Sequence, residues 1–162
     1  MKIKILNKPN CIIAARGGSK RLKGKNILKI NNKSLIEITI NHAVKSKIFD
    51  KIIVSTDSRK IASIAKKCGA QVPFLRSKKL SGDKIGILKV VKDVLNKTDS
   101  KNKTNNIFLY PTAILLKPSD LIKSYNKFKK SNCNFLIAIK KTPSNPLKSF
   151  EIRKNKLKYK WP

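Results

Sequence analysis

Acidic residues are scarce in this chain: its 162 residues include 8 Asp and Glu against 39 Lys and Arg, a formal net charge of +31. Such a balance ordinarily suggests a nucleic-acid partner or an anionic surface. The lysines, however, are spread from Lys2 to Lys160, and no aromatic residues alternate with them as base-stacking platforms. We therefore expect a solvated cationic surface and no specific nucleic-acid partner.

Long apolar runs are also missing. No stretch approaches the roughly 18 consecutive apolar residues of a membrane span, and residues 1–10 lack the sustained apolar core of a signal peptide. The cysteines, Cys11, Cys68 and Cys133, form an odd set without a close pair, so we expect buried, reduced thiols rather than disulfides or metal ligands. These absences predict a soluble cytoplasmic protein without a membrane partner.

Two common nucleotide-binding motifs are absent. Between Gly18 and Gly24 lie five residues where a Walker A loop has four, and Asn26 stands where that loop has the Ser or Thr that binds magnesium. No G-x-G-x-x-G run occurs, which removes the main support for a dinucleotide-dependent dehydrogenase.

Residues 12–26 are the most informative part of the chain, because an apolar run leads directly into a cationic loop. Residues 12–15 have the pattern of a buried parallel strand, and Gly17-Gly18 permit a sharp turn that brings backbone amides against phosphate oxygens. Positive charge comes from Arg16, Lys20, Arg21 and Lys25. We predict a binding site for a nucleoside triphosphate here.

The scarcity of arginine strengthens this prediction. The chain has 5 arginines against 34 lysines, so an arginine marks a position where lysine would not serve. Arg16 and Arg21 fall within six residues of each other, and only arginine offers a planar fork for bidentate contact with phosphate. The alternative is that Arg16 and Arg21 are two surface arginines that lie close together in the sequence by chance.

Strand and helix patterns alternate along the chain. Strands are expected at 11–15, 51–55, 107–110 and 135–139, with a further element at 71–75. Helices are expected from the capping box at 34–37, with Ile36, Ile40 and Val44 on one face, after a cap at 56–58, and at 85–95 and 118–128. The pattern predicts an α/β fold: a mostly parallel sheet, helices on both faces, and ligands at the carboxyl ends of the strands.

Three segments are expected: a lead-in at 1–10, a nucleotide-binding α/β domain at 11–142, and the start of a β extension at 143–162. Pro143 and Pro146 break the alternation, and residues 150–152 and 157–161 look like a short antiparallel pair. The chain ends at Trp161-Pro162 without the polar segment that usually closes a domain, so we expect a fold truncated at the C-terminus.

Five sequence blocks carry a family resemblance: ARGGSKR at 15–21 with Lys25-Asn26, FDKIIVSTD at 49–57, GAQVPFLR at 69–76, Leu80-Ser81 with Asp83, and LYPTA at 109–113. In this order they resemble the acylneuraminate cytidylyltransferases, which join CTP to a nine-carbon acidic sugar and release pyrophosphate. Arg21 and the run 110–113 are similar to the subgroup that acts on pseudaminic acid. Members acting on sialic acid tend to have Gly and Gln-Pro-Thr-Ser there; sialic and legionaminic acid remain the alternatives.

The resemblance implies a Rossmann-like fold of the nucleotide-diphospho-sugar transferase type, and roles for named residues. Those implied to clamp the triphosphate and stabilise charge on the leaving pyrophosphate are Arg16, Lys20 and Arg21. Those implied to contact the nucleotide are Gly17, Gly18, Ser19, Lys25, Asn26, Arg76, Ser81, Asp83, Tyr110, Pro111 and Thr112. For Arg76 and Asp83 a surface ion pair is the alternative, and Asp57 is expected to cap a helix rather than bind a metal.

The implied product is a CMP-sugar for cell-surface glycans or flagellin, made from CTP with Mg²⁺ by a protein that is a homodimer in its full-length form. Family members continue past the equivalent of Pro162 into a segment that completes sugar binding and the dimer and carries a late aspartate associated with magnesium. Lys84, Ile87 and Ile114 also depart from the family pattern. We therefore expect a nucleotide-binding half of an enzyme, with a catalytically weak CTP-binding remnant as the alternative.

Overall fold

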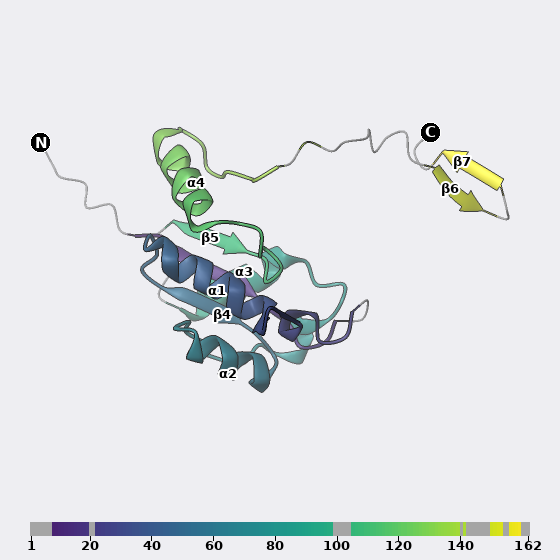
Figure 1. Cartoon of the computed structure of the whole chain (residues 1–162), viewed down its shortest axis with the longest axis horizontal. Helices are drawn as coiled ribbons and strands as arrows, with labels where there is room; N and C mark the ends of the chain where they lie inside the picture. Colours follow the sequence, from purple (N-terminus) through teal and green to yellow (C-terminus); the bar gives the residue numbers. More distant parts are fainter. Residues whose placement is uncertain are drawn as a thin grey trace, which may run out of the picture. The chain divides into compact units, whose positions relative to one another are not determined.

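The computed structural model describes residues 8–19, 22–98, 105–139, 141, 150–153 and 156–159. They fall into two compact units that divide between Lys127 and Phe128. The elements, in chain order (Figure 1), are β1 (Asn10–Ala14), η1 (Lys25–Ile27), β2 (Lys29–Ile30), β3 (Lys33–Ser34), α1 (Leu35–Ser46), β4 (Ile52–Ser55), α2 (Arg59–Lys67), η2 (Lys78–Ser81), α3 (Ile87–Lys97), β5 (Asn106–Leu109), α4 (Pro118–Lys130), β6 (Phe150–Arg153) and β7 (Lys156–Tyr159).

A parallel sheet of three strands, in the order β4-β1-β5, forms the centre of the first unit. Ile12 of β1 lies between Ile53 of β4 and Phe108 of β5. Two isolated parallel bridges continue the pairing on the other side of β4, at Gln71 and Leu75. The parallel sheet expected from the apolar runs is therefore confirmed.

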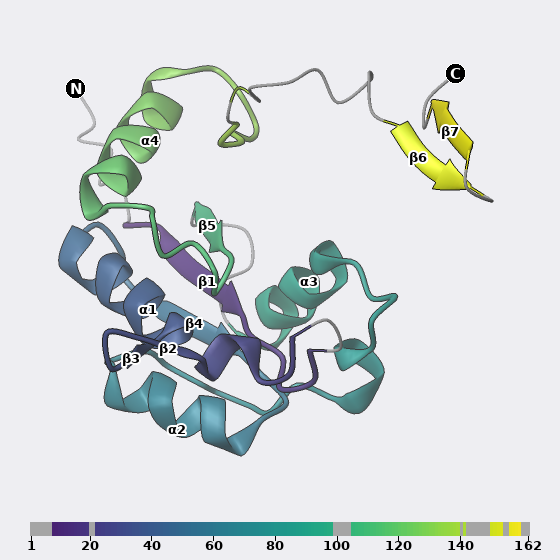
Figure 2. The same cartoon turned by 45° about the vertical axis from the view of Figure 1, so that its right-hand side comes forward.

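Helices cover both faces of this sheet, as expected. Along β1, Cys11 and Ile13 pack into a core with α1 and α2, whereas Ile12 packs on the other face with Val94 of α3. Figure 2 shows the same layers, with α1 and α2 on one side of the strands and α3 on the other. The alternation of side chains along β1 decides which helix each residue meets.

Local sequence signals account for the start of α1. The Ser34 hydroxyl accepts a hydrogen bond from the Glu37 amide at 3.4 Å, and the Glu37 carboxylate accepts one from the Ser34 amide at 3.2 Å, which is the predicted capping box. The predicted apolar face is right at Ile36 and Ile40 but wrong at Val44, which is 43% exposed while Ala43 is buried. The reason is geometric: eight residues of helix turn Val44 about 80° away from Ile36.

Other expectations also need correction. Residues 135–139 form no strand, and Phe135 and Ile139 are 73% and 92% exposed. β-propensity alone does not hold a strand, because its backbone needs a hydrogen-bonded neighbour. Cys11 is buried as expected, but Cys133 is exposed.

In the second unit, β6 and β7 pair antiparallel, with Phe150 opposite Tyr159, which confirms the hairpin expected there. Residues 160–162 lie outside the described residues. The division into segments at 10 and 142 stays a prediction. None of the helices in the described part of the chain is long and apolar enough to cross a membrane.

Candidate functional site

The carboxyl ends of β1, β4 and β5 meet at one edge of the sheet, because the three strands are parallel. The loop at 15–19 follows β1, residues 56–58 follow β4, and residues 110–112 follow β5. The structure therefore brings the cationic loop and the segment at 110–112 to the same edge. In open α/β sheets this edge is where ligands bind.

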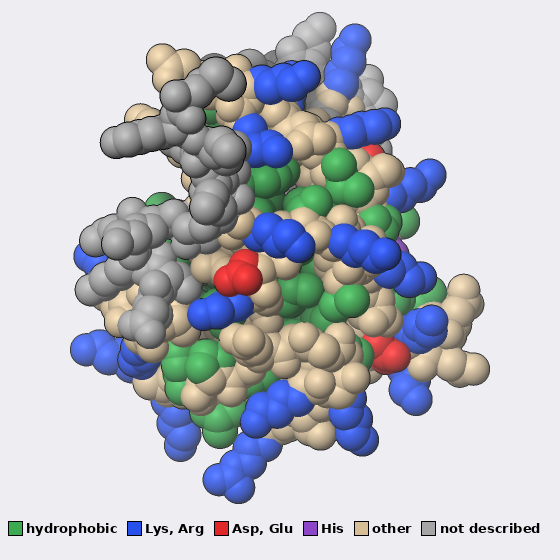
Figure 3. Space-filling view, turned by 90° about the vertical axis from the view of Figure 1, so that its left-hand side faces the viewer, with side chains coloured by type: hydrophobic (Ala, Val, Ile, Leu, Met, Phe, Trp, Pro, Cys, Tyr) green, Lys and Arg blue, Asp and Glu red, His purple; other side chains and the backbone are tan. Residues whose placement is uncertain are grey.

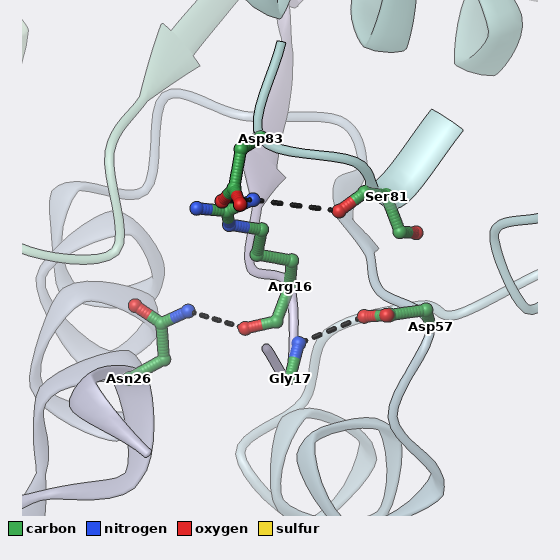
Figure 4. Close-up of polar contacts among 6 residues, drawn as sticks. All are labelled: Arg16, Gly17, Asn26, Asp57, Ser81 and Asp83. Carbon is green, nitrogen blue, oxygen red and sulfur yellow. Dashed lines mark hydrogen bonds and ion pairs between the residues drawn. The ribbon is translucent and has the colours of Figure 1, made fainter. Parts of the chain in front are cut away.

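Arg16 is held at this edge through both its side chain and its backbone (Figure 4). Its Nη1 lies 2.6 Å from Oδ1 of Asp83 and donates to the carbonyl of Ser81 at 3.4 Å, across 65 residues of sequence. The carbonyl of Arg16 accepts a hydrogen bond from Nδ2 of Asn26, a buried residue of η1, at 2.9 Å. Four of the predicted site residues, Arg16, Asn26, Ser81 and Asp83, are thus in direct contact.

The Arg16–Asp83 pair is open to water. The two side chains are 32% and 35% exposed, so solvent screens their attraction, and such pairs contribute about 0–1 kcal/mol to stability. An anion from solution can therefore compete with the Asp83 carboxylate for Arg16 at small cost.

Gly17 makes a contact that the sequence did not reveal. Its amide donates to Oδ1 of Asp57 at 2.8 Å, and a Cβ at Gly17 would lie 3.0 Å from Cβ of Ser58, tighter than ordinary packing allows. The prediction that Asp57 caps a helix is wrong, because the N-cap of α2 is Ser58, whose hydroxyl accepts from the Ile61 amide. The available signal was topological: Asp57 follows β4 as Gly17 follows β1, at the same edge of the sheet.

The rest of the cationic loop is only partly described. Gly18 is exposed with open space around it, Ser19 is half-buried, and Lys25 begins η1. Lys20 and Arg21, two of the three residues predicted to clamp phosphate, lie outside the described residues. Their roles stay predictions.

Arg76 is buried, with 6% of its surface exposed, so the alternative of a surface ion pair is wrong for this residue. Its backbone amide donates to the Thr56 carbonyl at 2.8 Å, which fixes it beside the end of β4. Nε and Nη2 are buried without a hydrogen-bond partner among the described residues. Burial lowers the pKa of Arg76, the nearby Asp57 carboxylate works against that shift, and the Arg16 cation adds to it.

Residues 110–112 present a mixed surface at the end of β5. Tyr110 is 57% exposed and packs its ring edge-on against Phe108, with centroids 4.9 Å apart. The Pro111 carbonyl accepts a hydrogen bond from the Thr39 hydroxyl of α1 at 2.9 Å, while Thr112 is exposed. The segment is therefore anchored to α1 and leaves Tyr110 and Thr112 accessible.

Magnesium was expected to accompany CTP. Among the described residues no three His, Cys, Asp or Glu side chains gather as a metal site requires. The carboxylates at this edge, Asp57 and Asp83, are engaged by Gly17 and Arg16. Both carboxylates therefore already have a partner, and a magnesium ion at this edge would be bound mainly through the phosphates that it accompanies.

Positive charge is not confined to the site. On the face drawn in Figure 3, Lys and Arg side chains are scattered among apolar and uncharged ones instead of forming a continuous stripe. On this face, therefore, the density of positive charge does not by itself mark the candidate site.

Comparisons with known proteins identify the family to which the chain belongs. The cytidylyltransferase family model matches residues 10–158. Pseudaminic acid cytidylyltransferase of Campylobacter jejuni subsp. jejuni serotype O:2 is 41% identical over 130 residues, which cover 79% of this chain and 56% of that protein. CMP-N,N'-diacetyllegionaminic acid synthase of the same organism is 47% identical over 94 residues, covering 58% of this chain and 40% of that protein.

A solved structure shares the fold. CMP:2-keto-3-deoxy-manno-octonic acid synthetase complexed with CTP superposes with a TM-score of 0.64 at 21% identity, covering 76% of this chain and 48% of that one. The chain spans about half the length of the curated relatives it matches. With the family model matched over most of its length, the chain belongs to the cytidylyltransferase family.

Proposed function

We propose that this chain is the nucleotide-binding part of an enzyme that transfers CMP from CTP to a nonulosonic acid, pseudaminic acid, and releases pyrophosphate. The observation that carries the proposal is the position of Arg16. It stands at the carboxyl end of the central strand, its guanidinium already holds a carboxylate, and it is accessible to an anion from solution. The relatives with pseudaminic acid in their names support the choice of sugar.

In the proposed reaction, the anomeric hydroxyl oxygen of the sugar attacks the α-phosphorus of CTP. A new oxygen–phosphorus bond forms, the bond from the α-phosphorus to the bridging oxygen breaks, the hydroxyl proton is released, and pyrophosphate leaves with the electron pair. Arg16, together with Lys20 and Arg21, stabilises the charge that builds on pyrophosphate. Positioning and electrostatics supply most of the rate in such transfers.

Arg76 and the end of β5 are proposed to receive the nucleoside. The buried Nε and Nη2 of Arg76 lack a partner in the described part of the chain, and a buried donor left unpaired costs about 1–3 kcal/mol. A hydrogen-bond acceptor on the bound nucleotide would remove that cost. Tyr110, Pro111 and Thr112 would border the same ligand from β5.

Magnesium is proposed to enter bound to the phosphates of CTP rather than to protein carboxylates. A homodimeric full-length form and a cytoplasmic location are likewise proposals. The flagellin connection rests on a relative from Campylobacter coli named post-translational flagellin modification protein B, which is 39% identical over 133 residues.

A second candidate substrate is a legionaminic acid. It is favoured by the higher identity, 47% over 94 residues, to a CMP-N,N'-diacetyllegionaminic acid synthase. The reaction and the roles of the loop residues are the same for both sugars.

Pyrophosphate release from CTP by the full-length protein, measured with pseudaminic, legionaminic and sialic acid side by side, tests the proposal. The expected result is turnover with pseudaminic acid well above that with the other two. Preference for another of these acids would change the substrate and keep the reaction. Saturable CTP binding without turnover on any acid would identify a binding module and refute the enzymatic proposal for this chain.

A further inference from the structure

Two of the chain's eight acidic residues, Asp57 and Asp83, lie at the candidate site. A carboxylate beside a loop that binds triphosphate repels the ligand. Each of these two aspartates is therefore expected to have a structural role that offsets this repulsion. Asp83 forms an ion pair with Arg16. Asp57 differs, because its Oδ1 accepts a hydrogen bond from a backbone amide.

The Asp57 contact continues the pairing of β1 and β4 beyond the ends of the strands. Ala14 pairs with Ser55, and the Ala15 amide donates to the Ser55 carbonyl at 2.9 Å. Further along, the Gly17 amide donates to the Asp57 side chain at 2.8 Å. Gly17 also approaches Ser58 so closely that only a glycine fits without a shift.

One peptide group is consequently held at both ends. The carbonyl of Arg16 and the amide of Gly17 belong to the same planar unit. The carbonyl accepts from Asn26 of η1 at 2.9 Å, and the amide donates to Asp57. Figure 4 shows the two side chains reaching this peptide from different segments.

We propose that Asp57 is a positioning residue: together with Asn26 it clamps the Arg16–Gly17 peptide and so sets the direction in which the Arg16 side chain enters the triphosphate site. This inference rests on the proposed function. It also reassigns the Gly17 amide, which holds the loop in place instead of donating to phosphate.

A carboxylate suits this position better than a neutral acceptor. Hydrogen bonds to an ionised acceptor are stronger than neutral ones. The negative charge also favours the charged form of the buried Arg76 nearby, against the effect of its burial. The positioning itself, however, requires only an acceptor oxygen at the right distance.

Two substitutions separate acceptor geometry from charge. Asp57→Asn keeps an oxygen at the same distance and loses the charge, whereas Asp57→Glu keeps the charge and moves the carboxylate out by one methylene. The control is Asp50→Asn, which removes the same charge from an exposed residue just before β4, at the opposite edge of the sheet. Affinity is measured by calorimetry with CTP and with inorganic tripolyphosphate.

Positioning predicts that Asp57→Glu weakens binding of both probes by roughly tenfold or more, while Asp57→Asn and Asp50→Asn stay within about threefold of wild type. The inference would be overturned if Asp57→Asn weakened binding more than Asp57→Glu, if the two substitutions weakened it equally, or if neither weakened it. If Asp57 acted only through its negative charge, Asp57→Asn would bind both probes more tightly than wild type and Asp57→Glu would bind them as wild type does.

A ligand-free readout separates this inference from the proposed function. Amide hydrogen exchange at Gly17 should be faster in Asp57→Glu than in wild type, and unchanged in Asp50→Asn. If wild type binds tripolyphosphate but shows no preference for CTP, the proposed function fails while the clamp is still judged on tripolyphosphate affinity. Unchanged Gly17 exchange in Asp57→Glu would overturn the clamp whatever the ligand.

Discussion

Replacing Asp83 by asparagine should strengthen the binding of CTP. Oδ1 of Asp83 lies 2.6 Å from Nη1 of Arg16, so a triphosphate that binds the guanidinium in its place must displace this carboxylate. Both side chains are about one-third exposed, which places the pair in the range of about 0–1 kcal/mol. Removing the pair therefore raises CTP affinity by up to about fivefold, since 1.36 kcal/mol corresponds to a factor of ten.

Isothermal titration of CTP into wild type, Asp83→Asn and Asp50→Asn measures this effect. Asp50→Asn removes an equal charge at the other edge of the sheet, so it corrects for the change in overall charge. The gain in Asp83→Asn should exceed that in the control and should shrink as salt is added. Weaker binding by Asp83→Asn would refute the reasoning, because it would mean that Asp83 contacts the nucleotide instead of standing in for its phosphate.

Three further predictions concern packing, pH and salt. Gly17→Ala should lower the free energy of unfolding, measured in urea, by about 1–3 kcal/mol, because the new Cβ would lie 3.0 Å from Cβ of Ser58. Gly18→Ala is the control and should leave the free energy of unfolding unchanged, because a Cβ at Gly18 would have nothing within 4 Å. Equal effects of the two substitutions would contradict the packing argument. Burial raises the pKa of the Cys11 thiol, so only the unfolded chain ionises this thiol as the pH rises past about 8.5. Stability should therefore fall by about 1.4 kcal/mol by pH 9.5 relative to Cys11→Ala, and parallel pH curves for the two proteins would contradict this. With a net charge of +31, CTP affinity should fall steadily with ionic strength; a salt-independent Kd would show that the surface charge contributes nothing to binding.

Individual strands and helix ends of the first unit could be predicted because their signals are local. The apolar run at 11–15 becomes β1, Ser34 and Glu37 form the expected capping box, and Gly69 at φ 85° follows the end of α2. Each of these features depends on residues adjacent in sequence or one helical turn away. The run at 135–139 has the same local pattern but no partner strand among the described residues, and pairing is not a local property.

The residues of the site could be predicted more readily than their partners. The glycines and arginines of the loop follow from phosphate chemistry, but the contacts of Arg16 with Ser81 and of Gly17 with Asp57 span 65 and 40 residues. Asp57 stands next to Ser58, and either could cap a helix. In the structure Ser58 caps α2, and Asp57 contacts Gly17, which the parallel pairing of β1 with β4 brings to the same edge of the sheet.

Arg16 is the proposed anchor for the triphosphate of CTP. Calorimetric titration of CTP into wild type, Arg16→Ala and Arg16→Lys tests it directly, with Lys51→Ala, an exposed residue before β4, as the control. We predict that Arg16→Ala lowers affinity roughly tenfold to hundredfold, in line with the loss of charged hydrogen bonds. Arg16→Lys should recover part of that loss, and Lys51→Ala should bind as wild type does. Equal affinity in Arg16→Ala and wild type would contradict the account.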